Sequence, residues 1–250
     1  MGAFLDFSNV SFAYHTKAGE TTALKDISFR VEEGEFVSIV GPSGCGKSTI
    51  LSLIAGLLQA EAGEIRIDEE NANTGYMLQK DHLFEWRSVY SNCILGLEIQ
   101  KKKSKENLMK VENMLIKYGL IPFKNARPSE LSGGLRQRAA LIRTLALDPK
   151  LLLLDEPFSA LDYQTRLAVG NDICNIIRDE KKTALLVTHD LGEAISLGNR
   201  ILVLSGRPAK IIYDIKIEFD DGLSSLQKRN TREFQEYFQT VWEVLNHGKA

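Results

Sequence analysis

One glycine-rich segment constrains the fold of this chain more than any other part of its sequence. Residues 41–48 read GPSGCGKS, which fits the pattern G-x-x-x-x-G-K-[ST]. A short run rich in β-branched residues (36–40) precedes the segment, and a helical pattern (47–58) follows it. Glycines at this spacing allow backbone N–H groups to converge on phosphate oxygens, and a helix N-terminus adds partial positive charge. The segment therefore predicts a phosphate-binding loop between a buried strand and a helix.

The side chains of this loop predict nucleotide binding. Lys47 can reach the β- and γ-phosphates, and the Ser48 hydroxyl can coordinate Mg²⁺. The residues expected to bind the nucleotide here are Gly41, Pro42, Ser43, Gly44, Cys45, Gly46, Lys47, Ser48 and Thr49. The loop alone does not distinguish an ATPase from a GTPase or a small-molecule kinase. A glycine-rich turn without a ligand is the structural alternative.

A second motif combines an apolar strand with two carboxylates. Residues 151–154 are four leucines, and Asp155 and Glu156 follow them directly. We expect this strand to carry Asp155 to the edge of the sheet where the phosphate loop lies. Asp155 suits Mg²⁺, directly or through water, and Glu156 can act as a general base toward the attacking water. Two adjacent carboxylates favour hydrolysis over simple nucleotide binding, although a strand ending in an acidic turn gives the same pattern.

Strand and helix patterns alternate around these motifs. Strand-like residues 151–154, a helical segment at 162–178 and a second strand at 184–188 follow one another. This alternation indicates an α/β fold with a largely parallel sheet covered by helices. Residues 80–148, in contrast, are expected to be mainly helical.

Composition excludes several other classes of protein. With 31 Lys+Arg and 33 Asp+Glu the formal charge is −2, which argues against a nucleic-acid-coating protein and against an acidic disordered chain. The cysteines, Cys45, Cys93 and Cys174, are too few and too scattered for a disulfide scaffold, so a reducing compartment is expected. No apolar run approaches the roughly 20 residues of a membrane span, and no signal peptide is apparent. We therefore expect a cytosolic chain without a membrane-spanning part.

Residues 131–138, LSGGLRQR, complete the pattern, and with them the sequence resembles the ATP-binding subunits of ABC transporters. Ser132 is a good N-cap, and Gly133 and Gly134 expose backbone donors at a helix start, which makes a second anion site. The resemblance implies that these three residues contact the γ-phosphate of ATP held by another copy. Two incomplete sites on one chain imply a head-to-tail pair of copies. Leu135 replaces the family's usual glutamine, but the backbone donors remain.

Other elements of this family occur in the expected order. The resemblance implies that Tyr14 stacks on adenine, with a half-buried strand tyrosine as the alternative. It implies that Gln79 senses Mg²⁺ and the attacking water and links to a membrane subunit, with a plain polar loop residue as the alternative. His189 would position the water and donate to the γ-phosphate. Residues 159–162 would couple the two sites, although Asp162 also suits a simple N-cap.

The resemblance also implies the domain organisation. It predicts a P-loop NTPase fold with a mixed, mostly parallel sheet, an N-terminal antiparallel β-subdomain and an inserted helical subdomain. The single ATPase domain would span residues 1–250, with its core at 1–79 and 149–220, the helical subdomain at 80–148 and a C-terminal helical extension at 221–250. An apolar stripe of that extension is expected to pack on its own domain, and it comprises Phe234, Tyr237, Phe238, Val241, Trp242 and Leu245.

The function implied by the resemblance is Mg²⁺-dependent ATP hydrolysis by an importer subunit. The expected partners are a second copy or a similar ATPase subunit, membrane permease subunits and, indirectly, an extracytoplasmic solute-binding protein, but no nucleic acid. The chain would lie peripherally on the cytoplasmic face of the inner or plasma membrane. Residues 86–89 and 194–204 are similar to the nitrate, sulfonate and taurine importer class, and thiamine-precursor importers look alike. Phe84 and Trp86 are candidates for an exposed docking groove, with a core role as the alternative.

Two other functions compete with this one. The first is a soluble ATPase of the same superfamily that is not coupled to transport, although such proteins usually carry tandem cassettes, coiled-coil insertions or basic patches. The second is a small-molecule kinase, which would not explain residues 131–138 or His189.

Overall fold

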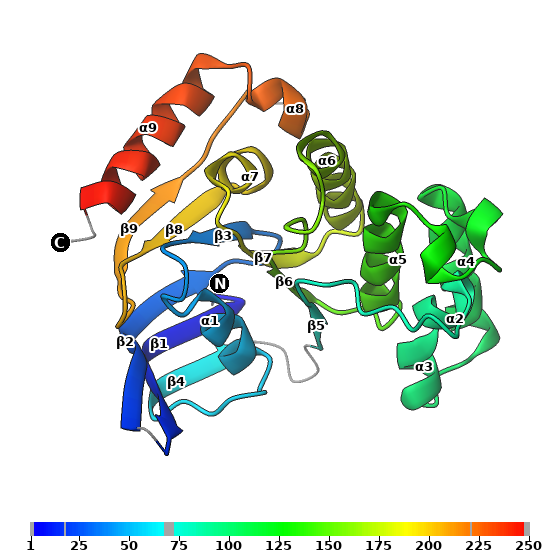
Figure 1. Cartoon of the computed structure of the whole chain (residues 1–250), viewed down its shortest axis with the longest axis horizontal. Helices are drawn as coiled ribbons and strands as arrows, with labels where there is room; N and C mark the ends of the chain where they lie inside the picture. Colours follow the sequence, from blue (N-terminus) through cyan, green and yellow to red (C-terminus); the bar gives the residue numbers. More distant parts are fainter. Residues whose placement is uncertain (1–2, 18, 68–72, 221, 248–250) are drawn as a thin grey trace.

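In the described part of the chain the strands form two sheets. The computed structural model describes residues 3–17, 19–67, 73–220 and 222–247 (Figure 1). The larger sheet has the order β5-β6-β7-β3-β8-β9, with all neighbours parallel except the last pair. Its strands are β3 (Phe36–Val40), β5 (Thr74–Met77), β6 (Leu151–Asp155), β7 (Thr183–Val187), β8 (Arg200–Leu204) and β9 (Ile211–Lys216). The expected mixed, mostly parallel sheet is therefore confirmed.

The smaller sheet is antiparallel and has the order β2-β1-β4. Its strands are β1 (Leu5–Thr16), β2 (Gly19–Val31) and β4 (Ala62–Ile67). Figure 1 shows α1 (Lys47–Ile54) between this sheet and the larger one, and apolar residues of α1 and of both sheets form one buried cluster. The helix ends at Ile54, earlier than the predicted residue 58, because Gly56 adopts a φ of 69° and turns the chain.

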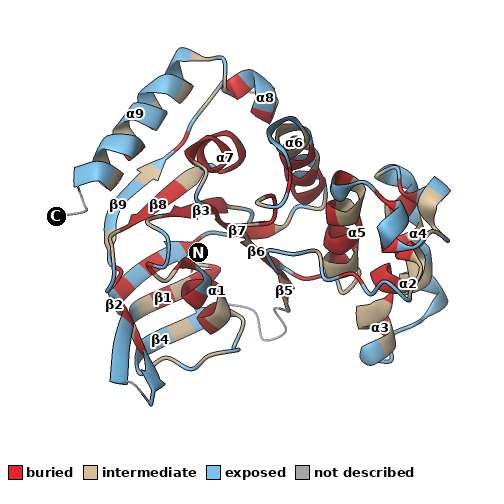
Figure 2. Ribbon diagram, viewed as in Figure 1, coloured by how far each residue is buried: buried red, intermediate tan, exposed pale blue. Residues whose placement is uncertain are grey.

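Helices cover the parallel strands, and this explains their apolar runs. Every residue of β3 and β7 is buried, as are the four leucines of β6 (Figure 2). On the face opposite α1, the sheet is covered by α6 (Tyr163–Asp179), α7 (Leu191–Leu197) and α9 (Arg232–His247) (Figure 1). Cys45, Cys93 and Cys174 are all buried free thiols.

A helical region lies beyond β5 (Figure 1). It consists of α2 (Val89–Cys93), α3 (Leu95–Ile99), α4 (Lys105–Lys117), η1 (Ile121–Phe123), η2 (Pro128–Glu130) and α5 (Gly133–Leu145). Ser104 and Ser132 cap α4 and α5, respectively, through side chains that accept backbone N–H bonds. The inserted helical region agrees with the expected fold, whereas the boundaries at residues 80 and 148 stay a prediction.

The C-terminal segment contains α8 (Ser225–Lys228) and α9. Val241 is buried, and Phe234, Tyr237 and Leu245 pack against the buried cluster of α7 and β8, as predicted. The prediction was wrong for Phe238 and Trp242, which are 38% and 54% exposed, because they lie at the solvent side of the apolar stripe. None of the described helices combines the length and the apolar character needed to cross a membrane.

Candidate active site

The predicted phosphate loop, residues 41–48, lies between β3 and α1 at the carboxyl end of the sheet. Gly44 and Gly46 adopt φ angles of 73° and 123°, which disfavour residues with a Cβ atom. A Cβ on Gly46 would also lie 2.8 Å from Cδ2 of Leu24. These positions therefore require glycine for backbone geometry and for space, which explains why the sequence pattern is so specific.

Lys47 begins α1 and folds its side chain back over the loop. Its Nζ donates to the carbonyl oxygens of Gly41 and Pro42, at 3.0 and 3.1 Å, and the side chain is buried. Both acceptors are neutral, so these bonds orient the ammonium group without cancelling its charge. An oriented positive charge on a loop of backbone donors is what a bound polyphosphate requires.

Ser48 and Asp155 meet although they are far apart in the sequence. The Ser48 Oγ donates to Asp155 Oδ1 at 2.8 Å, and the Tyr76 hydroxyl donates to Asp155 Oδ2 at 3.3 Å. Burial raises the pKa of Asp155 above its ordinary value, while these two bonds act in the opposite direction. Burial also raises the pKa of Tyr76 to about 12, so its phenol remains a donor at neutral pH. Tyr76 was not predicted as a site residue, since nothing in its local sequence distinguishes it from other strand tyrosines.

The Ser48 and Asp155 oxygens fit Mg²⁺. This cation prefers hard oxygen ligands and usually takes only one or two from the protein, with water and substrate phosphates completing its shell. Among the residues that the structure describes, no group of three His, Cys, Asp or Glu side chains could hold a metal by itself. A pair of oxygen donors suits a shared site, in which the phosphates of a bound substrate would supply the remaining ligands.

Glu156, Gln79 and His189 form a second cluster, where β5, β6 and β7 end. The Gln79 Nε2 donates to Glu156 Oε2 at 3.4 Å and to Ser159 Oγ at 3.3 Å. The His189 Nδ1 lies 3.1 Å from the same Glu156 oxygen. Glu156 has a φ of 44°, and its N–H donates to the Val187 carbonyl at 2.9 Å. Such left-handed backbone in a non-glycine residue is uncommon and is often found at functional sites.

Tyr14 lies beside the first turn of α1. Its hydroxyl is 3.0 Å from Thr49 Oγ1, and its ring is 40% exposed and contacts the ring of Phe12 edge-on. The structure therefore places an accessible aromatic ring next to the phosphate loop.

Asp162 caps α6 by accepting the Thr165 N–H at 3.1 Å, so its simple capping interpretation is confirmed.

The segment Ser132, Gly133 and Gly134 lies apart from the phosphate loop. It begins α5, which packs against α2, α6 and β5, whereas α1 packs against β6 and β7. Within the described residues, no hydrogen bond or ion pair joins this segment to residues 41–48. Leu135 packs its side chain against the buried cluster of the helical region, so its side chain takes no part in the exposed start of the helix. Ser132 and Gly133 are exposed as expected, whereas Gly134 is buried because Val169 and Thr165 of α6 lie against it. The two segments that the sequence predicts to bind anions therefore lie apart on one chain.

A further cation contacts the phosphate loop and was not predicted. Arg207, in the connection between β8 and β9, donates from Nη2 to the Gly44 carbonyl at 2.6 Å. No local sequence motif identifies this arginine as a site residue. It reaches the phosphate loop because β3, which leads into the loop, and β8, which leads to Arg207, are neighbours in the sheet.

Comparison with known proteins agrees with this geometry. The family model described as ABC transporter matches residues 24–159. A Bacillus subtilis (strain 168) protein, the "Uncharacterized ABC transporter ATP-binding protein YtlC", is 45% identical over 98% of this chain and 96% of its own length. The aliphatic sulfonates import ATP-binding protein SsuB of Bacillus cereus (strain ZK / E33L) is 38% identical, over 98% of this chain and 96% of its own. The taurine import ATP-binding protein TauB of Ruegeria pomeroyi is 36% identical, over 97% of this chain and 92% of its own.

Solved structures show the same architecture. The dimeric ATP-binding cassette MJ0796, in a post-hydrolysis state bound to ADP and Pi, is similar with a TM-score of 0.72 and 30% sequence identity. The similarity covers 86% of this chain and 100% of that chain.

Proposed function

The chain belongs to the ABC transporter family and is an ATPase of that family, and we propose that it drives the uptake of a small solute through a separate membrane permease. The observation that carries the catalytic part of the proposal is the position of two clusters at one sheet edge. Ser48 bonds Asp155 beside the phosphate loop, and Gln79 and His189 converge on Glu156 next to it. The first suits a phosphate-bound cation and the second suits activation of water.

Each residue of these clusters has a proposed role. Glu156 accepts the proton of the water that attacks the γ-phosphate. His189 directs Nδ1 toward Glu156, which leaves Nε2 for the γ-phosphate. Gln79 directs its amide nitrogen toward Glu156 and Ser159, which leaves its carbonyl oxygen for the water or for Mg²⁺. Ser48, Asp155 and Gln79 are the residues that would hold Mg²⁺, which would neutralise phosphate charge.

The nucleotide is proposed to bind along one side of the antiparallel sheet. Lys47 and the backbone N–H groups of residues 41 and 43–49 hold the phosphates, and the exposed ring of Tyr14 stacks on adenine. The contact of Tyr14 with Thr49 supports this position, since Thr49 belongs to the first turn of α1.

The functional unit is proposed to be a head-to-tail dimer. In the described part of the chain, no hydrogen bond or ion pair joins Ser132, Gly133 and Gly134 to the phosphate loop. Ser132 and Gly133 are exposed at the start of a 13-residue helix, and Gly134 lies buried behind them. In a dimer they complete the ATP site of the other copy, and the phosphate charge stabilises the closed pair. The dimeric MJ0796 cassettes support this assembly.

The domains are proposed to divide this work. Residues 1–79 and 149–220 hold the nucleotide, residues 80–148 present Ser132–Gly134 to the other copy, and residues 221–250 form an extension. Phe84 and Trp86 are exposed and stacked, with ring centroids 4.6 Å apart, which supports the docking of a permease on this part of the chain. The protein would then lie peripherally on the cytoplasmic face of the membrane.

The transported solute is proposed to belong to the nitrate, sulfonate, taurine or thiamine-precursor class. The names of the SsuB and TauB relatives favour sulfonates, delivered by an extracytoplasmic solute-binding protein. A deletion strain should then fail to grow on an alkanesulfonate or taurine as the only sulfur source, while growth on sulfate stays normal.

A soluble ATPase not coupled to transport is the second candidate. The alignments with importer subunits over nearly the whole chain favour transport. Copurification separates the two functions: a hydrophobic membrane protein in detergent supports transport, whereas ribosomes or DNA would support the alternative.

The catalytic assignment is tested by Glu156→Gln. The variant should bind ATP and dimerise, while turnover falls roughly 10²- to 10⁴-fold, because the general base is lost but the phosphate contacts remain. Glu180→Gln is the matched control, since Glu180 pairs with Lys117 and Tyr118 away from the site, and its turnover should equal that of the parent chain. Normal turnover in Glu156→Gln would refute the assignment.

A further inference from the structure

The loop of residues 81–88, which carries the exposed pair Phe84 and Trp86, is fixed to α5 by an arginine on the first part of that helix. Arg136 donates from Nε to Asp81 Oδ2 at 2.9 Å and from Nη2 to Asp81 Oδ1 at 3.1 Å. Its Nη1 also lies 3.0 Å from Glu85 Oε1. A two-point contact between a planar guanidinium and a carboxylate fixes orientation as well as distance.

A second arginine of α5 holds the backbone of the same loop. Arg143 donates to the carbonyl oxygens of Asp81 and His82, at 2.6 and 2.7 Å. Arg136 and Arg143 are seven residues apart, which is close to two helical turns, so both project from the same face of α5. The helix therefore holds the start of the loop along two turns of its length.

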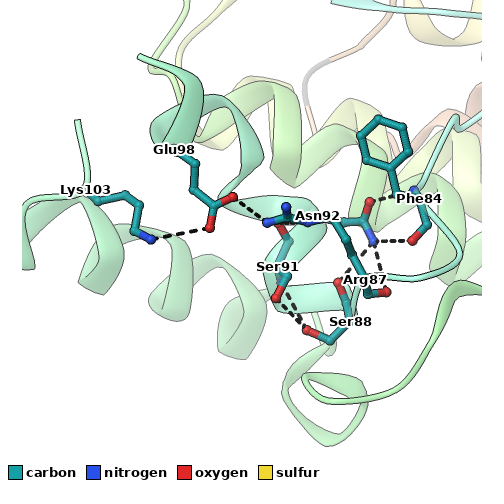
Figure 3. Close-up of polar contacts among 7 residues, drawn as sticks. All are labelled: Phe84, Arg87, Ser88, Ser91, Asn92, Glu98 and Lys103. Carbon is teal, nitrogen blue, oxygen red and sulfur yellow. Dashed lines mark hydrogen bonds and ion pairs between the residues drawn. The ribbon is translucent and has the colours of Figure 1, made fainter. Parts of the chain in front are cut away.

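Asn92 of α2 holds the other end of the loop (Figure 3). This side chain is fully buried; it accepts the Phe84 N–H at 2.8 Å and donates to the carbonyl oxygens of Phe84, Arg87 and Ser88 at 3.1, 3.3 and 3.0 Å. Both ends of the loop thus depend on side chains of the helical region.

Gln79, two positions before this loop, faces the other way. Gln79 bonds Glu156 and Ser159 in the core of the ATPase, so the chain passes from the catalytic cluster to the helical region within two residues.

We propose that Arg136 and Arg143 are positioning residues that make α5 and residues 81–88 move as one unit, so that any displacement of Ser132–Gly134 is transmitted to Phe84 and Trp86. The inference rests on the proposed function, in which the start of α5 binds the ATP of the other copy. It adds the physical connection between that ATP and the aromatic pair that faces the permease. Arg136 acts through Asp81 and Glu85, and neither arginine needs to touch the nucleotide.

The chain offers an internal reporter for this connection. Trp86 and Trp242 are its two tryptophans, so Trp242→Phe leaves Trp86 alone. In a full-length Glu156→Gln/Trp242→Phe parent, ATP with Mg²⁺ should change the emission and acrylamide quenching of Trp86. Adding Asp81→Asn should reduce that change, while the affinity for a fluorescent ATP analogue remains that of the parent. Asp81→Glu keeps the charge and should retain most of the change.

Asp172→Asn is the matched control. It also removes a carboxylate that pairs with an arginine of α5, Arg138, but Asp172 belongs to α6 and not to the loop of residues 81–88. It should leave the ATP-dependent change of Trp86 intact. Arg143→Gln tests the connection independently by removing the two carbonyl contacts, and it should also reduce the change. Circular dichroism would establish that each variant is folded. If either Asp81→Asn or Arg143→Gln is not folded, the other variant alone tests the connection.

Three results would overturn the inference. They are an unchanged Trp86 response in both Asp81→Asn and Arg143→Gln, an equal loss in Asp172→Asn, and a parent that binds ATP without any response of Trp86. A parent that does not bind ATP at all would instead refute the proposed function, and the inference with it.

Discussion

Replacing the buried amide of Asn92 by Asn92→Ala should destabilise the fold by about 3 kcal/mol. The amide oxygen accepts one backbone N–H, and its nitrogen faces three carbonyl oxygens but carries only two hydrogens. The side chain therefore makes three full hydrogen bonds at most. A net contribution of about 1 kcal/mol for each gives the estimate, and any partner left buried without a bond adds to it.

Urea titrations followed by circular dichroism would measure this change. Asn107→Ala is the matched control, because Asn107 makes one side-chain bond of 2.8 Å to the Lys102 carbonyl at an exposed position. Its effect should stay within about 0.5 kcal/mol. If Asn92→Ala changed the free energy of unfolding by less than about 1 kcal/mol, the reasoning that this amide organises residues 84–88 would be wrong.

Three further perturbations test other parts of the molecule. Gly134→Ala should lower stability by about 1–3 kcal/mol, because its Cβ would lie 2.7 Å from Val169 Cγ2, and Val169→Ala in the same chain should restore most of the thermal midpoint. Burial raises the pKa of Glu193 above its ordinary 4.5, so the folded chain binds the proton of this carboxyl group more tightly than the unfolded chain does. The stability of the parent chain therefore falls as the pH rises from the pKa of the unfolded state through the pKa of the folded state. Urea titrations between about pH 4 and 7 should therefore show Glu193→Gln gaining stability relative to the parent as pH rises, and a constant difference would contradict this sign. Tyr14→Ala should weaken ATP binding roughly 5- to 100-fold by equilibrium titration, whereas Tyr14→Phe keeps the ring, loses only the contact with Thr49, and should stay within about 3-fold.

Much of the candidate site could be predicted because its elements depend on local sequence. The phosphate loop needs glycine where φ is positive, and Gly46 meets that requirement between a β-branched strand and a helix. Ser132 and Asp162 cap helices through bonds to residues three positions later. The leucines of β6 end at Asp155, so the position of a carboxylate at the sheet edge follows from the direction of the strand.

Periodicity was less informative at the surface of the fold. The apolar stripe of α9 predicts which side of the helix packs, but not how wide the covering surface is. Phe238 and Trp242 stay exposed because the cluster of α7 and β8 covers only part of the stripe. The spacing of apolar residues along a helix identifies the side that packs, whereas the burial of each residue depends on what lies opposite.

Sequence alone determined the class of fold, the phosphate loop, the catalytic carboxylate candidates and the start of α5, since each depends on residues within one or two elements. Only the tertiary structure decided which distant side chains complete them. Tyr76 reaches Asp155 across 79 positions, Arg207 reaches Gly44 across 163, and Arg136 reaches Asp81 across 55. No local pattern encodes such pairs, because strand order and helix packing bring them together, and a hydrogen bond requires its atoms to lie within about 3 Å of each other.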